Sequence, residues 1–317
     1  MQRVTTIADL RAAIADLRRD GGRVALVPTM GALHSGHLEL VTEARRHAEH
    51  VVVSIFVNPT QFGPGEDLDA YPRDLAGDEA ALASLGDAAP ELVFAPSVDE
   101  VYPRGTPLTR VLVDGLTERL CGARRPGHFD GVGLVVTKLH NLVAPDVVLY
   151  GRKDFQQLQV IRRIVADLDQ RVEVVGAPLV REHDGLAMSS RNRYLDAADR
   201  AAALALSRAL RAGVLAARAA RDVGRAITAD LLLDAAGGIL RDAPEVRLDY
   251  LEAVDPDTLA PPDPGADAAR GEDADGDGSP TELLLAVACF VGTARLIDNV
   301  LVGDTDDEDR LLAATGG

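Results

Sequence analysis

Short apolar runs alternate with amphipathic stretches along the first half of the chain. Runs of about four to eight Val, Leu and Ile residues are typical of strands that are buried on both faces of a parallel sheet. Stretches with apolar residues three and four positions apart predict helices between these runs. We expect strands at residues 24–27, 51–57, 92–96, 110–113, 147–150 and 172–178, and helices at residues 5–19, 37–47 and 132–143.

The order of these elements predicts an α/β fold. Strands joined by a helix form right-handed crossover units, which build a Rossmann-like parallel sheet. After residue 188 the pattern changes to Ala- and Leu-rich helices followed by alternating strands, which predicts a smaller C-terminal α+β domain. Its helices are expected at residues 197–219 and 223–241, and its strands at residues 246–254, 282–291 and 295–302. We therefore expect a ligand-binding domain at residues 1–188 and a smaller domain at residues 189–303.

Two acidic segments lack the apolar residues that a packed core requires. Residues 261–280 are rich in Pro, Gly, Ala and Asp, and we expect a disordered surface loop there. We expect the acidic tail at residues 304–317 to be disordered as well. The formal net charge of −17 argues against a nucleic-acid partner, because phosphate backbones are bound by Lys and Arg.

The composition favours a cytoplasmic location. Cys121 and Cys289 lie far apart in the sequence and match neither a disulfide framework nor a metal-binding motif, so we expect free thiols in a reducing compartment. The N-terminus lacks the apolar segment of a signal peptide, and no apolar run approaches the roughly 18 residues that a membrane span requires. We therefore expect no membrane contact.

The segment PTMGALHSGH, residues 28–37, lies between a predicted buried strand and a predicted helix. Gly31 and Gly36 allow the backbone to turn tightly and to approach a ligand. Free amides and the positive dipole end of a helix attract phosphate, and His34 and His37 add directional donors. We interpret the segment as a phosphate-binding loop. His37 could instead be a cap or a surface residue, and the two histidines could bind a metal, although no third ligand lies nearby at a suitable spacing.

Two further segments follow predicted strands, at the sheet edge where parallel sheets bind ligands. The Gln61 amide can both donate and accept, which suits a hydroxyl next to a carboxylate, but it could also bond its own turn. Lys153, in residues 151–154, suits a phosphoryl oxygen. Asp154 could accept from a ribose hydroxyl or cap the next helix, in whose first turn Gln157 can face the same crevice as Gln61.

Two loops have open interpretations. Ser189, Ser190 and Arg191 can bind a triphosphate, because hydroxyls bond its oxygens and a guanidinium neutralises departing pyrophosphate. A Ser there could also simply cap the next helix. The Gly-rich, locally basic residues 120–132 are either a mobile lid or a linker to the helix that follows.

Together these segments resemble the pantothenate synthetase (pantoate:beta-alanine ligase) family. The motifs PTMGALHSGH, FVNPTQF, DLDAYPRD, RPGHFDGV, YGRKDFQQ and GLAMSSRNRYL occur in the order of that family, over about residues 5–303. The His-x-Gly-His pattern resembles the signature of the nucleotidyltransferase and class I aminoacyl-tRNA synthetase superfamily, whose members attack the α-phosphate of ATP. Tyr150 and His140 stand where the family often has Phe, and Arg152 stands where it often has Glu.

The resemblance implies a role for each motif. It implies that the first domain binds nucleotide and pantoate, that His37 is the proton donor beside the α-phosphate, and that Lys153 is the main cation. Gln61 and Gln157 are implied to bind pantoate, and Gln61 also borders beta-alanine. The implied catalytic residues are His37, His34, Lys153, Ser189, Ser190 and Arg191. The implied ATP-binding residues are Met30, Gly31, Ala32, Leu33, His34, Ser35, Gly36, His37, Gly151, Arg152, Lys153, Asp154, Val180, Met188, Ser189, Ser190 and Arg191.

The implied activity is an ATP-dependent ligase reaction. (R)-Pantoate and beta-alanine would give pantothenate, AMP and pyrophosphate through a pantoyl adenylate, with Mg²⁺ bound to the ATP. The resemblance also implies a homodimer. Alternatives are a simple adenylyltransferase of the same superfamily and an inactive nucleotide-binding protein. Gln61 and Gln157 argue against the adenylyltransferase, because a phosphorylated acceptor would favour cationic side chains.

Overall fold

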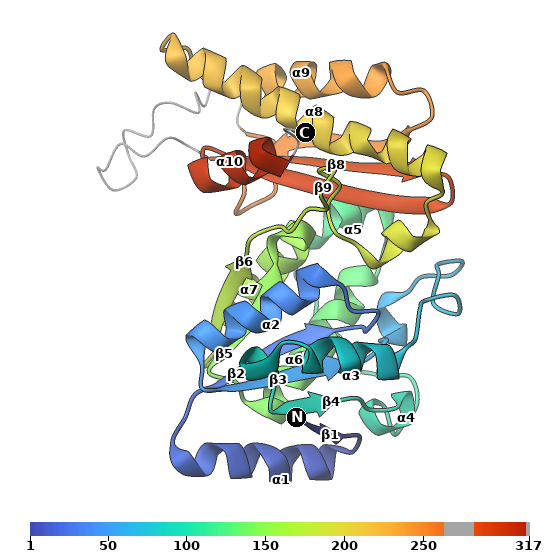
Figure 1. The fold of residues 1–317 in the computed structure, drawn as a ribbon, viewed down its shortest axis with the longest axis vertical. Helices are drawn as coiled ribbons and strands as arrows, with labels where there is room; N and C mark the ends of the chain where they lie inside the picture. Colours follow the sequence, from blue (N-terminus) through green and yellow to red (C-terminus); the bar gives the residue numbers. More distant parts are fainter. Residues whose placement is uncertain (263–281, 315–317) are drawn as a thin grey trace. The chain divides into compact units, whose positions relative to one another are not determined.

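The computed structural model describes residues 1–262 and 282–314 (Figure 1). The chain divides into two compact units, Met1–Pro178 and Leu179–Gly317, whereas the sequence suggests a later boundary, after residue 188. Residues 180–188 belong to the second unit because they fold back on themselves and are anchored there. The Met188 amide donates to the Val180 carbonyl at 2.9 Å, and Arg181 forms an ion pair with Asp298 at 2.7 Å.

The first unit is built on a parallel sheet, as the sequence predicts. Within the described residues it has six strands in the order β1-β4-β3-β2-β5-β6, and every neighbouring pair is parallel. The central strands are continuous runs of buried Val, Leu and Ala, because both faces of the sheet are covered. The strands are β1 (Gln2–Val4), β2 (Val24–Thr29), β3 (His50–Ile55), β4 (Leu92–Phe94), β5 (Val147–Gly151) and β6 (Glu173–Ala177).

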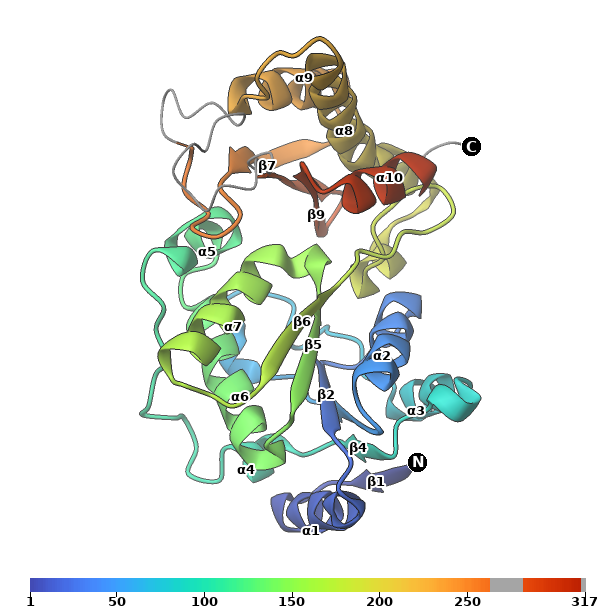
Figure 2. The ribbon, with the colours of Figure 1, turned by 90° about the vertical axis from the view of Figure 1, so that its left-hand side faces the viewer.

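Helices cover both faces of this sheet. Helices α2 (Ser35–His47) and α3 (Leu75–Ala83) lie on one face, and α6 (His128–Val143) and α7 (Phe155–Asp167) lie on the other (Figure 2). The remaining helices of the unit are α1 (Ile7–Leu17), α4 (Val98–Val101) and α5 (Leu120–Arg124). Short 3-10 turns are η1 (Arg18–Asp20), η2 (Pro59–Gln61), η3 (Gly86–Ala88), η4 (Leu116–Glu118) and η5 (Arg152–Asp154).

The strand order reverses between β2 and β5. From β2 the chain passes through α2 to β3 on one side, and it later returns through α6 to β5 on the other side of β2. Ala25 of β2 pairs with Val147 of β5, so the two strands are direct neighbours. Open α/β sheets bind ligands outside the carboxyl ends of the strands at such a reversal. The loops that follow β2 and β5 are therefore the first place to look for a site.

The strand predicted at residues 110–113 is wrong. Within the described chain no strand is assigned there, and Leu112 is 59% exposed. An alternating pattern needs a neighbouring strand to complete its hydrogen bonds. The two edges of this sheet are formed by β1, which pairs with β4, and by β6, which pairs with β5. The sequence analysis missed β1 because three residues are too few to show a period.

The second unit packs helices on an antiparallel sheet, which confirms the predicted α+β architecture. Helices α8 (Ala197–Asp222) and α9 (Ala229–Arg241) lie against the sheet β7-β8-β9. Its strands are β7 (Arg247–Val254), β8 (Leu283–Val291) and β9 (Ala294–Val302). Leu206 and Leu210 of α8 share one buried core with Leu285 and Val287 of β8.

The acidic tail forms a helix, which corrects the prediction of disorder. Helix α10 spans Thr305–Ala314. Its Glu308 is fully buried and accepts hydrogen bonds from Arg218 at 2.8 Å and Arg221 at 3.2 Å, while Leu311 packs into the core. A buried carboxylate is stable when it is paired in this way, and the composition of the tail alone does not reveal the two arginines on α8. The loop predicted to be disordered at residues 261–280 lies outside the described residues from residue 263 onward.

Neither a membrane-spanning helix nor a disulfide appears in the described structure. No helix in residues 1–262 and 282–314 is both long enough and apolar enough to cross a bilayer. Cys121 and Cys289 are buried free thiols, as predicted. Burial raises the pKa of Cys289 to about 12, so this thiol is protonated and unreactive at neutral pH.

Candidate active site

The predicted phosphate-binding loop follows β2 and is held in an unusual backbone conformation. Gly31 and Ala32 both have positive φ angles, of 81° and 51°, and such a conformation needs support when the residue is not Gly. Asp78 of α3 supplies it: its carboxylate oxygens accept from the amides of Ala32 at 3.0 Å and Leu33 at 2.7 Å. Asp78 is only 4% exposed. The sequence analysis missed this residue, because nothing in the local sequence links an acid on a helix to a loop more than forty residues earlier in the chain.

His34 and His37 stack on each other at the start of α2. Their ring centroids are 4.0 Å apart, with 30° between the planes. His37 Nδ1 accepts from the His34 amide at 3.4 Å, so in the neutral ring the proton is on Nε2. Burial, together with the nearby His34 and Lys153, lowers the pKa of His37 to about 3. His37 is therefore a neutral hydrogen-bond donor at physiological pH and not an imidazolium.

Lys153 reaches the same region from the end of β5. The strand ends at Gly151, and η5 carries Arg152, Lys153 and Asp154 into the start of α7. The Lys153 side chain is 19% exposed, and its Nζ lies 3.8 Å from the Asp154 carboxylate. Its charge is one of the causes of the low pKa of His37, and the strands that lead into the two loops, β2 and β5, are direct neighbours in the sheet. The two neighbouring strand ends thus bring a cation and two imidazoles together.

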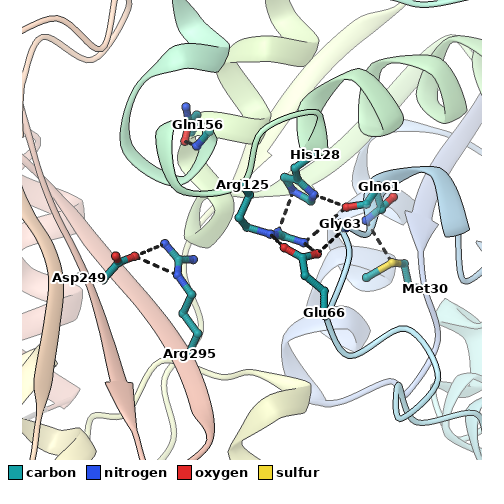
Figure 3. Close-up of polar contacts among 10 residues, drawn as sticks. Met30, Gln61, Gly63, Glu66, Arg125, His128, Gln156, Asp249 and Arg295 are labelled. Atoms are coloured by element: carbon teal, nitrogen blue, oxygen red, sulfur yellow. Dashed lines mark hydrogen bonds and ion pairs between the residues drawn. The ribbon is translucent and has the colours of Figure 1, made fainter.

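Gln61 lies in η2, directly after β3, and is buried. Its Nε2 donates to the Met30 sulfur at 3.2 Å, so its amide contacts the first residue of the loop after β2 (Figure 3). Its Oε1 accepts from Asn58 Nδ2 at 3.0 Å. Both ends of the Gln61 amide are therefore oriented by neighbouring groups.

Asn58 organises the surroundings of Gln61 and was missed as a functional candidate. It is 1% exposed. Its Oδ1 accepts from the hydroxyls of Tyr102 and Thr60, each at 2.9 Å, and its Nδ2 also donates to the Gly131 carbonyl at 3.1 Å. The side-chain amide therefore has four partners, which fixes its orientation. The sequence signal was its place directly after a buried strand.

Gln157 and its neighbour Gln156 have different surroundings in the first turn of α7. Gln157 is half-buried. Gln156 is buried, and its Nε2 donates to the carbonyls of Leu116 and Arg119, each at 2.7 Å. Gln156 thus anchors the segment that precedes α6, and Gln157 is the one of the two that keeps its place as a candidate for binding substrate.

The second unit carries the remaining predicted residues. Val180 and Met188 are joined by a backbone hydrogen bond, so the structure brings these two parts of the predicted nucleotide site together. Ser189 Oγ accepts from the Arg191 amide at 3.3 Å and caps η6 (Ser190–Tyr194). This hydroxyl therefore has the capping role that the sequence offered as an alternative to binding a triphosphate. Ser190 is buried and Arg191 is half-buried.

Two of the departures from the family pattern lie next to each other. His140 Nε2 is 3.3 Å from the Tyr150 hydroxyl, and His140 Nδ1 is 2.7 Å from Gln170 Oε1. Burial lowers the pKa of His140 and raises the pKa of the Tyr150 hydroxyl. Both side chains are therefore neutral, and each satisfies a polar atom of the other in the core of the first unit.

The described residues do not support the metal-site alternative for the histidines. No group of three or more His, Cys, Asp or Glu side chains in residues 1–262 and 282–314 is arranged to hold a metal ion. The stacked rings, the neutral His37 and the adjacent Lys153 suit an anionic ligand instead. A phosphate oxygen would accept hydrogen bonds from imidazole N–H groups and pair with the ammonium group.

Comparison with known proteins gives a consistent family assignment. The family model described as pantoate-beta-alanine ligase matches residues 2–301. A pantothenate synthetase from Myxococcus xanthus is 50% identical over 309 residues, which cover 96% of this chain and 98% of the relative. A crystal structure of pantothenate synthetase from Thermus thermophilus has a TM-score of 0.81 at 48% identity, covering 95% of this chain and 99% of its own.

A further solved structure contains bound molecules. It is the pantoate-beta-alanine ligase from Francisella tularensis, complexed with beta-gamma ATP and beta-alanine. Its TM-score to this chain is 0.70 at 28% identity, and the match covers 95% of this chain and 97% of the other. The match to the family model, the sequence identity and the coverage agree with the fold and the motifs. The chain belongs to the pantoate-beta-alanine ligase family.

Proposed function

We propose that the protein condenses (R)-pantoate with beta-alanine at the expense of ATP, giving pantothenate, AMP and pyrophosphate. The observation that carries the proposal is the meeting of the stacked His34 and His37 with Lys153 at the ends of two adjacent strands, with Gln61 in contact with Met30. This arrangement offers anion-binding donors for a triphosphate next to an oriented amide that suits a hydroxy acid.

In the first step, a pantoate carboxylate oxygen attacks the α-phosphorus of ATP. The bond from that phosphorus to the bridging oxygen of the β-phosphate breaks, and pyrophosphate leaves with the electron pair. Lys153 and the Nε2–H of neutral His37 stabilise the charge that develops on the α-phosphoryl oxygens. In this scheme the hydroxyls of Ser189 and Ser190 donate hydrogen bonds to the departing pyrophosphate, and the Arg191 guanidinium neutralises its charge. ATP is taken up as its magnesium complex, so the ion belongs to the substrate.

In the second step, the amine of beta-alanine attacks the acyl carbon of the pantoyl adenylate. The bond from that carbon to the AMP oxygen breaks, and the amine loses a proton as the amide forms. A mixed anhydride hydrolyses easily, so water must be kept away until the amine arrives. Gln61 borders both the pantoate and the beta-alanine positions in this scheme.

The low pKa of His37 refines the role that the family resemblance implies. In the protein without ATP, a ring whose pKa is lowered to about 3 is neutral at pH 7, so in this scheme His37 meets the phosphate as a neutral hydrogen-bond donor. A preorganised neutral donor stabilises developing charge without first binding the ground-state phosphates as tightly as a cation would.

Two wider features belong to the same proposal. We place the protein in the cytoplasm, where a reducing environment keeps Cys121 and Cys289 as the free thiols found here. We also expect a homodimer, and light scattering coupled to size-exclusion chromatography measures this directly. A monomeric mass would contradict the homodimer and leave the chemistry of a single chain unchanged.

Pantoate-dependent exchange of labelled pyrophosphate into ATP tests the proposal. The exchange requires a reversible adenylation step, and it should proceed without beta-alanine. Exchange that depends on a phosphorylated acceptor instead of pantoate would favour a simple adenylyltransferase. Bound ATP with no exchange and no pantothenate formed would identify an inactive nucleotide-binding protein.

A further inference from the structure

Three charged or polar side chains from outside the η2 turn contact the backbone of residues 61–63. Glu66 comes from the loop after η2, Arg125 directly follows α5, and His128 is the first residue of α6. Arg125 Nε and Nη2 donate to the two Glu66 carboxylate oxygens, each at 2.7 Å (Figure 3). The Arg125 and Glu66 side chains are 19% and 25% exposed, so this bidentate pair is mostly shielded from solvent.

His128 connects this ion pair to Gln61. Its Nδ1 lies 2.8 Å from the Gln61 carbonyl oxygen, and its Nε2 lies 3.0 Å from Arg125 Nη1. A carbonyl only accepts and a guanidinium only donates, so the imidazole must carry its proton on Nδ1 and accept at Nε2. Both contacts require the neutral ring in this one tautomer.

The charges around His128 agree with that assignment. Burial and the Arg125 charge lower the pKa of His128 to about 4, although the Gln61 carbonyl, Glu66 and Asp154 act in the opposite direction. Burial by itself would raise the pKa of Glu66, but the Arg125 guanidinium holds it below the usual value. At neutral pH the three side chains are therefore a carboxylate, a guanidinium and a neutral imidazole.

The other end of η2 is held by direct backbone packing. A Cβ on Gly131 would lie 2.2 Å from the Thr60 carbonyl oxygen, so only Gly allows α6 to approach η2 this closely. The η2 turn is therefore fixed by Gly131 on one side. The contacts of Glu66, Arg125 and His128 fix it on the other side, where the loop toward Gly63 begins: the Gly63 amide donates to Glu66 at 3.2 Å.

We propose that Glu66, Arg125 and His128 form a latch that positions Gln61 for the hydroxy-acid substrate. His128 donates a hydrogen bond to the Gln61 carbonyl, and Arg125 donates to His128 and so fixes its tautomer. Glu66 orients the Arg125 guanidinium through the bidentate ion pair. These are positioning residues, because they act through Gln61 and not on the substrate. The proposal rests on the proposed function, since it assigns the latch to the pantoate side of that reaction.

Two substitutions of His128 separate positioning from simple packing. The amide nitrogen of Asn in His128→Asn can replace Nδ1 as the donor to Gln61, whereas Gln in His128→Gln extends past that position toward Arg125. Losing one such hydrogen bond changes an equilibrium by about tenfold. We expect His128→Gln to raise the KM for pantoate by about tenfold and the KM for ATP by less than about twofold. In His128→Asn the KM for pantoate should stay close to that of the unsubstituted protein. The proposal would be overturned if both variants raised the KM for pantoate equally, or if His128→Gln raised the KM values for pantoate and ATP by the same factor.

Hydrogen exchange tests the latch independently of catalysis. We expect Glu66→Gln to speed exchange of the amides of residues 61–63 several-fold, because the charged bidentate pair with Arg125 is lost. Glu91→Gln is the matched control: it removes the charge of a carboxylate whose two oxygens both accept from Arg45 Nη2, and Glu91 lies before β4 at the amino end of the same sheet. This variant should leave the exchange rates of the amides of residues 61–63 unchanged.

The two experiments fail in distinguishable ways. Unchanged exchange at residues 61–63 in Glu66→Gln would overturn the latch, whatever the enzyme catalyses. Faster exchange in a protein with no pantoate-dependent turnover would support the latch and reject the proposed function.

Discussion

The loops that follow β2 and β5 meet at the same edge of the sheet but contribute different chemistry. The loop after β2, residues 30–37, offers two imidazoles and backbone amides, and its conformation is held by the buried Asp78. The corner after β5 offers the cation Lys153 on a short turn. One loop is thus preorganised around a neutral His37, and the other is charged. Burial keeps His37 neutral and the close cation adds to this effect, so the charge of one loop influences the protonation state of the other.

This division suits phosphoryl transfer. A cation attracts the triphosphate before reaction, while oriented neutral donors act mainly on charge that develops as the bond to the leaving group lengthens. Four changes should therefore have separable effects: removal of the Lys153 cation, removal of the His37 donor, protonation of His37, and loss of the Asp78 carboxylate that supports the loop.

Removing the cation should have the largest effect. We expect Lys153→Ala to slow adenylation by about 10² to 10³, as for the loss of one preorganised electrostatic group. Pantoate-dependent pyrophosphate exchange measures this rate. Arg163→Ala is a control on α7, since Arg163 forms an exposed ion pair with Asp167 and should have little effect. Unchanged adenylate formation in Lys153→Ala would contradict its role.

Removing the neutral donor should cost somewhat less. We expect His37→Ala to lower kcat by about 10², and His37→Gln to recover about tenfold of that loss because its amide can place an N–H near the Nε2 position. Single-turnover formation of AMP checks both values. His47→Ala, at the other end of α2, is the control. If Ala and Gln at position 37 behave alike, His37 is not acting as a neutral hydrogen-bond donor.

The low pKa of His37 predicts a pH-dependent stability. The unfolded chain protonates this histidine below about pH 6.5, whereas the folded protein does so only near pH 3. Stability from this residue is therefore present above pH 6.5 and is lost as the pH falls toward 3. Between pH 7 and pH 5 the loss should be about 2 kcal/mol, and His37→Gln should lose that much less than the unsubstituted protein.

Urea denaturation at the two pH values measures this difference. Equal losses in the two proteins would mean that His37 has the same pKa in the folded protein as in the unfolded chain. The contrast between a neutral His37 and a charged Lys153 would then disappear.

Loosening the support of the loop should have the smallest effect. In Asp78→Asn one of the two loop amides loses its acceptor, and we expect kcat/KM for ATP to fall by about tenfold. Glu79→Gln, the adjacent residue with a partly exposed partner in Arg3, is the control. An unchanged kcat/KM for ATP in Asp78→Asn would show that the loop keeps its conformation without this carboxylate.

The sequence predicted the framework of both loops well. Buried β-branched runs placed the strands before Met30, Gln61 and Lys153, and the structure has strands that end shortly before each of these residues. The errors occurred where a segment depends on distant partners. Residues 110–113 have a strand-like pattern without a neighbouring strand in the described chain, and the acidic tail becomes a helix because Arg218 and Arg221 neutralise Glu308.

The sequence alone therefore determined most of the elements, the family and the candidate residues for the reaction, because hydrophobic period and motif spacing are local properties. Only the tertiary structure decided how those residues are held and charged. Asp78 accepts hydrogen bonds from a loop that lies more than forty residues earlier in the chain. Arg125 and His128 donate to the Gln61 carbonyl. Burial and the Lys153 charge keep His37 neutral. Hydrogen bonding, burial and electrostatic coupling act between atoms that are close in space, and closeness in space is what a linear sequence does not state.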